Sequence, residues 1–235
     1  MRNTTLLALS LLAAAATLAS AGGLNLRWSD CAADGGTQNR TFACNTNVGT
    51  SAFVGSFVLD QDVQQVNGNE SILDIQFADA TVPQWWTFRN PGSCRLTALS
   101  IAAQDGVSCP DPFSGQASMN IATYQLGIQG MANWARLLCV NGVQQIHIVD
   151  LTGGQEYGLA RWTITNAKTV GTGSCGGCTT EATIEFRWAN ITTDLGLNDT
   201  NLTEGADPGS NFITWQALPT ATRNTTWGAV KSLYR

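Results

Sequence analysis

The pattern of apolar residues constrains the fold of this chain more than any other feature of its sequence. After residue 21, no stretch of ten residues keeps the 3.6-residue period of an amphipathic helix. From 181 to 188, apolar residues instead occupy every second position, which predicts a half-buried strand. Residues 157–165 and 73–77 alternate in the same way, and residues 52–59 are apolar on both faces, as is typical of a central strand.

Several further segments predict short strands, and their spacing predicts the fold class. These segments are 24–28, 85–88, 96–102, 121–128, 134–140, 145–149 and 212–216. Asn141-Gly142 lies between two of them and predicts a hairpin turn, because both residues tolerate a positive φ. Residues 192–210 predict a long exposed acidic loop, and residues 227–234 a short helix. We therefore expect an all-β chain, folded as a single antiparallel β-sandwich or jelly-roll-like domain.

The first 21 residues have the three regions of a secretory signal peptide. Arg2 supplies the positive charge, residues 6–16 form the apolar run, and Ala19-Ser20-Ala21 matches a small-residue cleavage site. The run is shorter than the roughly 20 residues of a membrane-spanning helix. We expect cleavage after Ala21, no membrane span, and a secreted or extracellular domain over residues 22–235. In a bacterium this domain would lie in the periplasm or at the cell surface.

Low charge limits the classes of partner. Charged residues make up 12% of the chain, against about 25% in a typical soluble domain. The formal net charge is −5, and Lys168 and Lys231 are the two lysines. A nucleic acid partner requires clustered Lys and Arg, so the composition argues against one.

Seven cysteines follow residue 21, and disulfides are expected in a secreted protein. Pairing neighbours in the sequence closes the shortest loops. The candidate pairs are Cys31 with Cys44, Cys94 with Cys109, and Cys175 with Cys178. The last pair is a CxxC motif, which also suits a redox site or half of a metal site, but its flanks resemble a loop and no second Cys or His pair is present. Cys139 lies in an apolar run and is expected to be a buried thiol.

The sequence contains no recognisable catalytic constellation, so we expect a binding or structural domain rather than an enzyme. His147 is the single histidine, and no GxSxG motif is present to supply the nucleophile of a Ser-His-acid triad. One histidine also cannot form a multi-histidine metal site. No cofactor and no metal site is predicted. Calcium is an alternative at residues 67–70 and 198–201, where Asx turns explain the same composition. The alternative function is a secreted glycoside hydrolase with carboxylates assembled across strands.

The tryptophans provide the candidate ligand site. Trp85 and Trp86 are adjacent, so a strand at this position would point one indole outward, where it could stack on a sugar ring. Arg89 is close enough in the sequence to form a cation–π contact with either indole. We therefore predict a non-enzymatic extracellular domain that binds a glycan or cell-surface polymer through Trp85, Trp86 and Arg89. A self-associating surface subunit is the third hypothesis, and packing of both indoles in the core is the structural alternative.

Several sequence blocks resemble a group of uncharacterised secreted bacterial proteins. The blocks are Trp28-x-x-Cys31, Phe42-Ala43-Cys44-Asn45-Thr46-Asn47, Trp85-Trp86, the CxxC motif, and the C-terminal stretch from Thr222 to Arg235. The resemblance covers nearly all of residues 22–235. It implies a secreted bacterial protein, but no activity, ligand or site residue is attached to it.

Overall fold

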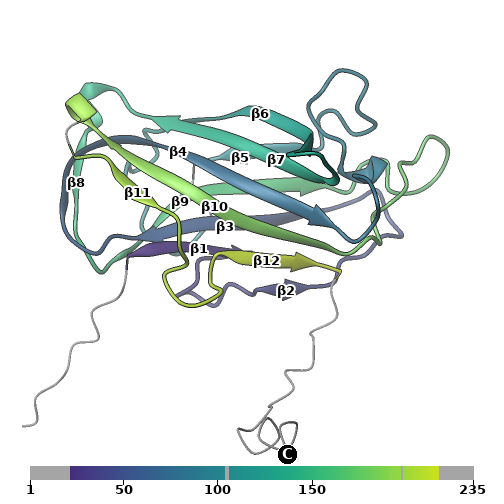
Figure 1. The fold of residues 1–235 in the computed structure, drawn as a ribbon, viewed down its shortest axis with the longest axis horizontal. Helices are drawn as coiled ribbons and strands as arrows, with labels where there is room; N and C mark the ends of the chain where they lie inside the picture. The colour runs from purple at the N-terminus through teal and green to yellow at the C-terminus, as the bar shows by residue number, and fades with distance from the viewer. Residues whose placement is uncertain (1–21, 104–105, 197, 217–235) are drawn as a thin grey trace, which may run out of the picture.

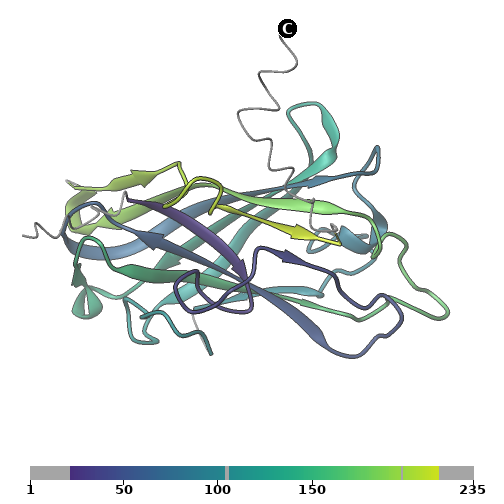
Figure 2. The same ribbon diagram turned by 90° about the horizontal axis from the view of Figure 1, so that it is seen from below.

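The computed structural model describes residues 22–103, 106–196 and 198–216. These residues form two β-sheets packed face to face, which confirms the predicted all-β sandwich. The larger sheet faces the viewer in Figure 1, and the view from below in Figure 2 shows the two layers one above the other. None of the helices in the described part of the chain has the length and apolarity to span a bilayer.

The smaller sheet has four antiparallel strands. Its order is β1 (Gly23–Trp28), β3 (Thr50–Val58), β9 (Glu156–Thr165) and β5 (Leu99–Ala102). The segment that was apolar on both faces is therefore central, because β3 lies between β1 and β9. A Cβ atom at Gly55 would lie 2.9 Å from the rings of Phe186 and Trp162, so this strand approaches the opposite sheet too closely for a side chain.

The larger sheet has a path of six strands with two short additions. The path is β2 (Asn39–Arg40), β12 (Phe212–Trp215), β10 (Ala182–Thr193), β4 (Val63–Phe77), β7 (Met131–Gly142) and β6 (Ser118–Ile128). β11 (Thr200–Leu202) pairs with β10, and β8 (Val149–Leu151) pairs with β4. β2 and β12 are parallel, and the other pairs are antiparallel.

Aromatic side chains fill the space between the sheets. Five indoles have 0% exposed area: Trp28, Trp85, Trp86, Trp162 and Trp215. Each removes roughly 150–250 Å² from water, which makes this cluster a main source of hydrophobic stabilisation. Cys139 lies in the same core with its thiol unpaired, as predicted.

Four segments differ from their predicted secondary structure. Residues 84–86 and 145–147 form the 3₁₀ helices η1 (Gln84–Trp86) and η2 (Gln145–His147). Asn141-Gly142 is not a hairpin turn, because both residues are paired within β7 to the strands on either side. The hairpin instead joins β6 to β7 at Gln129-Gly130, where both φ values are positive. The acidic segment contains the 3₁₀ helix η3 (Asp194–Gly196) and β11, and the predicted helix at 227–234 lies outside the described residues.

All six candidate cysteines form disulfides, but the local pairing is wrong. The bonds join Cys31 to Cys109, Cys44 to Cys178, and Cys94 to Cys175, over sequence separations of 78, 134 and 81 residues. The CxxC cysteines therefore bind two different loops rather than each other. Sequence proximity failed as a guide because the strands carry distant loops to the same end of the sandwich. There the Cα atoms of Cys44 and Cys178 lie 5.8 Å apart, and those of Cys94 and Cys175 lie 6.1 Å apart.

Candidate functional site

The predicted outward indole at Trp85 or Trp86 does not exist, because both side chains are buried. A 3₁₀ turn replaces the expected strand and directs both rings into the core. Trp85 Nε1 donates a hydrogen bond to Thr169 Oγ1 at 2.9 Å. Neither indole can contact a ligand in this arrangement.

The arginine that stacks on Trp85 is Arg95 and not Arg89. The Arg95 guanidinium carbon lies 3.5 Å from the Trp85 ring centroid. The group donates to the backbone oxygens of Trp85, Thr165 and Ala167, and burial lowers its pKa to about 10. Arg95 therefore joins the loops around the buried indoles and has a structural role.

Arg89 lies at the edge of the larger sheet. Its Nη2 donates to Ile121 O at 3.4 Å, and the neighbouring Asn90 Nδ2 donates to Tyr124 O at 2.8 Å. Both acceptors belong to β6, the last strand of the path. These two side chains occupy backbone acceptors that would otherwise be open to another strand.

Trp188 on β10 is an outward-facing aromatic residue of the larger sheet. The register of β10 against β4 shifts between Phe186 and Trp188, so Arg187 is an additional residue without a direct partner. This β-bulge moves Trp188 to the outer face, while Phe186 before it and Ala189 after it stay in the core. The sequence contains the signal: the apolar residues of this strand are even-numbered up to 186 and odd-numbered from 189.

Trp188 is held in a row of apolar residues. Its cross-strand neighbour is Ile72, which in turn is paired with Leu138 on β7, and all three side chains are half-buried. The indole Nε1 donates to Asn201 Oδ1 on β11 at 3.0 Å. This bond restricts the ring, so the outer face presents an oriented aromatic surface.

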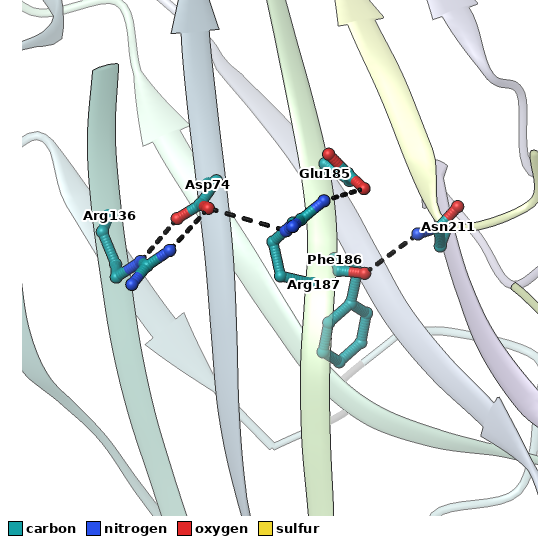
Figure 3. A network of polar contacts seen from close by, with 6 residues as sticks. All are labelled: Asp74, Arg136, Glu185, Phe186, Arg187 and Asn211. Atoms are coloured by element: carbon teal, nitrogen blue, oxygen red, sulfur yellow. Dashed lines mark hydrogen bonds and ion pairs between the residues drawn. The ribbon is translucent and has the colours of Figure 1, made fainter. Parts of the chain in front are cut away.

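The adjacent row consists of charged residues (Figure 3). Arg136 on β7 binds both carboxylate oxygens of Asp74 on β4 at 2.7 Å, and these hydrogen bonds raise the pKa of Arg136. Arg187 lies 3.8 Å from Asp74 and binds Glu185 at 2.9 Å. Two cations and two anions therefore balance each other beside the indole.

The same face continues toward the start of β10. Gln76, Thr183 and the adjacent residues of β4 and β10 line a shallow hollow. Trp134, also half-buried, is the cross-strand partner of Gln76. The Gln76 amide, the Thr183 hydroxyl and the Trp134 indole thus extend the outer face of the sheet beyond the charged row.

The geometry offers little support for catalysis or metal binding in the described residues. Asp74 and Glu185 are cross-strand partners, but the Asp74 side chain is 4% exposed and both its oxygens are bound to arginine. Asp30, Cys31 and Asp34 lie close together, yet Cys31 is in a disulfide, and Asp30 accepts hydrogen bonds from Ser108.

The two candidate calcium segments are engaged within the fold. Residues 67–70 belong to β4, and Asp199 accepts two hydrogen bonds from Thr193. His147 lies in η2. Residues 67–70 therefore lie in a strand and not in the Asx turn that the sequence offered as the alternative to a calcium site.

Comparisons with known proteins identify no family for this chain. No protein-family model matches the sequence, and no curated protein matches it either. One solved structure similar to it is the second type II cohesin module of the cellulosomal adaptor scaffoldin ScaA of Acetivibrio cellulolyticus. The sequence identity is 9%, the match covers 85% of this chain and 98% of that module, and the TM-score is 0.34. A likeness at this level supports no conclusion about function.

Proposed function

We propose that this chain is a secreted, non-enzymatic domain that binds a neutral glycan on the outer face of its larger sheet. The observation that carries the proposal is the β-bulge at Arg187, which turns Trp188 out of the core beside a charge-balanced polar row. Three disulfides agree with an oxidising, extracellular location. This proposal keeps the predicted ligand class and moves the site from Trp85 and Trp86 to Trp188.

An indole on a flat sheet suits the apolar C–H face of a sugar ring. Trp combines a large apolar surface with a polar edge, and here the edge is already hydrogen-bonded to Asn201. The face of the ring is the part left for a ligand. Because the ring is anchored before binding, little side-chain entropy is lost when a sugar stacks on it.

The charges near Trp188 favour a neutral ligand. Arg136 and Arg187 are balanced by Asp74 and Glu185, so the row has no net charge to attract an acidic polymer. The negative charge of the whole chain disfavours a polyanion further. Carboxylate, guanidinium and amide groups together supply donors and acceptors for sugar hydroxyls.

The second indole defines the length of the binding face. Trp134 lies on β7, two strands away from β10, and four residues along β7 from Leu138, which is level with Trp188. Standard strand spacings therefore place the Cα atoms of Trp134 and Trp188 at a separation of roughly 17 Å. The charged row lies between them along the strands, and the hollow at Gln76 is level with Trp134. A chain of several sugar units would cover this distance, so the face suits a polysaccharide better than a monosaccharide.

The test is retention of the mature, disulfide-bonded protein in native gels that contain neutral or acidic polysaccharides. We expect retention by at least one neutral polysaccharide, and at least a tenfold loss of affinity in Trp188→Ala, equivalent to about 1.4 kcal/mol. Trp134→Ala should weaken binding less. Ile146→Ala, at an exposed position away from this face, is the matched control, and circular dichroism verifies folding.

Two results would reject the proposal. The first is that no neutral polysaccharide retains the wild-type protein. The second is that Trp188→Ala is retained as strongly as Ile146→Ala. Release of reducing sugar ends from a retained polysaccharide would instead favour the glycoside hydrolase alternative.

A further inference from the structure

A row of polar side chains crosses the outer face of the larger sheet next to Trp188. Asn190 follows Trp188 by two residues on β10, so the two side chains point to the same side. Glu70 on β4 and Asn201 on β11 are the direct partners of Asn190 on the two neighbouring strands. We call Asn201, Asn190 and Glu70 the polar row. It lies on the opposite side of Trp188 from the charged row.

The polar row has unused hydrogen-bonding capacity. Glu70 is exposed, and its carboxylate has neither a hydrogen bond nor an ion pair within the described part of the chain. Asn190 Oδ1 is buried without a donor. Asn201 Oδ1 accepts from Trp188 Nε1, and its Nδ2 has no partner among the described residues. A ligand can therefore bind these groups without breaking a contact within the protein.

The charged row differs in this respect, because its groups are largely bonded to one another. Both oxygens of Asp74 accept hydrogen bonds from Arg136, and Glu185 Oε1 accepts one from Arg187. A sugar hydroxyl that binds these groups competes with an existing ion pair. Recognition of hydroxyls is more favourable at the polar row, because no bond within the protein is lost there.

The polar row is within reach of a sugar ring stacked on Trp188. Strand geometry places the Cα atoms of Trp188 and Asn190 roughly 6.5 Å apart. The Cα atoms of the cross-strand partners Asn190 and Glu70 are roughly 5 Å apart. Asn201 is bonded to the indole itself. A ring that covers the indole would therefore direct hydroxyls at its edge toward Asn190 and Glu70.

We propose that Glu70 and Asn190 select a glycan with free adjacent hydroxyls on the sugar that stacks on Trp188; this inference rests on the proposed function. A carboxylate only accepts hydrogen bonds, so its two oxygens suit two neighbouring hydroxyl donors. The Asn190 amide both donates and accepts, so it suits a further hydroxyl. A sugar without these donors is rejected, because it covers the carboxylate and leaves it unpaired. An acidic sugar is rejected by the charge of Glu70.

The test uses four soluble neutral polysaccharides, arabinoxylan, galactomannan, mixed-linkage β-glucan and dextran, together with their O-methylated derivatives. Methylation removes hydroxyl donors and keeps the polymer neutral. Affinity gel electrophoresis of the mature, disulfide-bonded protein should show that at least one parent polymer binds, and that its methylated form binds about tenfold more weakly. Glu70→Gln should weaken binding of that parent about tenfold, and Asn190→Ala about fivefold. Neither variant should change the affinity for the methylated form.

Glu204→Gln is the matched control, because Glu204 is also an exposed glutamate but lies beyond β11 and outside the polar row. It should bind like the wild type, and circular dichroism verifies the folding of every variant. Preference for the parent polymer that persists in both Glu70→Gln and Asn190→Ala would overturn the inference. If Trp188→Ala loses binding in the same experiment, the proposed function stands without it.

Three other results would also overturn the inference. Equal weakening toward the parent and the methylated polymer would show that Glu70 and Asn190 do not recognise hydroxyls. Loss of wild-type binding in EDTA, restored by calcium, would show that a cation and not these side chains contacts the sugar directly. If no parent polymer binds the wild-type protein, the inference and the proposed function both fail.

Discussion

Removing the disulfide between Cys44 and Cys178 should cost about 4 kcal/mol of unfolding free energy. With the other two disulfides intact, the shortest closed path runs 13 residues from Cys44 to Cys31, 15 residues from Cys109 to Cys94 and 3 residues from Cys175 to Cys178. Chain entropy for a loop of about 31 residues gives about 4 kcal/mol, compared with about 2 kcal/mol for a Cys175–Cys178 bond. This difference separates the observed connectivity from the local one.

A pair of single substitutions provides the sharper comparison. Cys44→Ala and Cys178→Ala remove the same bond, so each should lower stability by a similar amount, and the double variant should cost little more than either. In a locally paired protein the two substitutions would break different bonds, and their costs would add. Urea unfolding of the oxidised proteins measures all three values, with the m-value checked for two-state behaviour.

Additive costs would refute this reasoning, as would a loss below about 1 kcal/mol for the double variant. Non-reducing peptide mapping is an independent check on the bond itself. It should recover Cys44 linked to Cys178, and a fragment linking Cys31 to Cys44 would contradict the structure.

Two further predictions concern buried polar groups. Burial raises the pKa of the Cys139 thiol from 9.0 to about 11, so the folded state keeps its proton while the unfolded state loses it. The free energy of unfolding should fall by about 1.4 kcal/mol per pH unit between pH 9 and 11 through this group. Equal slopes for the wild type and Cys139→Ala in this range would show that the thiol is not buried. Arg136→Met should cost about 2–3 kcal/mol in chemical unfolding, because it leaves Asp74 buried with Arg187 at 3.8 Å. Arg187→Met, at a side chain that is 51% exposed, should cost less than about 1 kcal/mol, and equal costs for the two variants would be evidence against a special role for Arg136.

Local periodicity was sufficient for much of the fold. The alternation at 182–186 predicted β10 correctly, and the apolar stretch at 52–59 predicted the central strand β3. In both cases the side-chain period follows from strand geometry, and the burial of one or both faces is recorded in the residues themselves. The buried thiol at Cys139 was predicted from its apolar neighbours for the same reason.

The predicted ligand residues do not lie on the surface as a group. The outward indole was expected at Trp85 or Trp86, but both are in the core, and Trp188 lies on the outer face. Strand alternation was applied to a segment that forms a 3₁₀ turn, and it was applied without interruption across the bulge at Arg187. One additional residue reverses the face of every residue after it, so the alternation assigned Trp188 to the wrong face.

The sequence by itself determined the all-β class, the central strand and the burial of Cys139, because these depend on composition and on the period of nearby residues. Tertiary structure alone decided the disulfide partners and the burial of Trp85 and Trp86. Each of these depends on which distant loops the sheet order brings to the same end. Contacts between residues separated by 78 to 134 positions leave no periodic trace in the sequence between them.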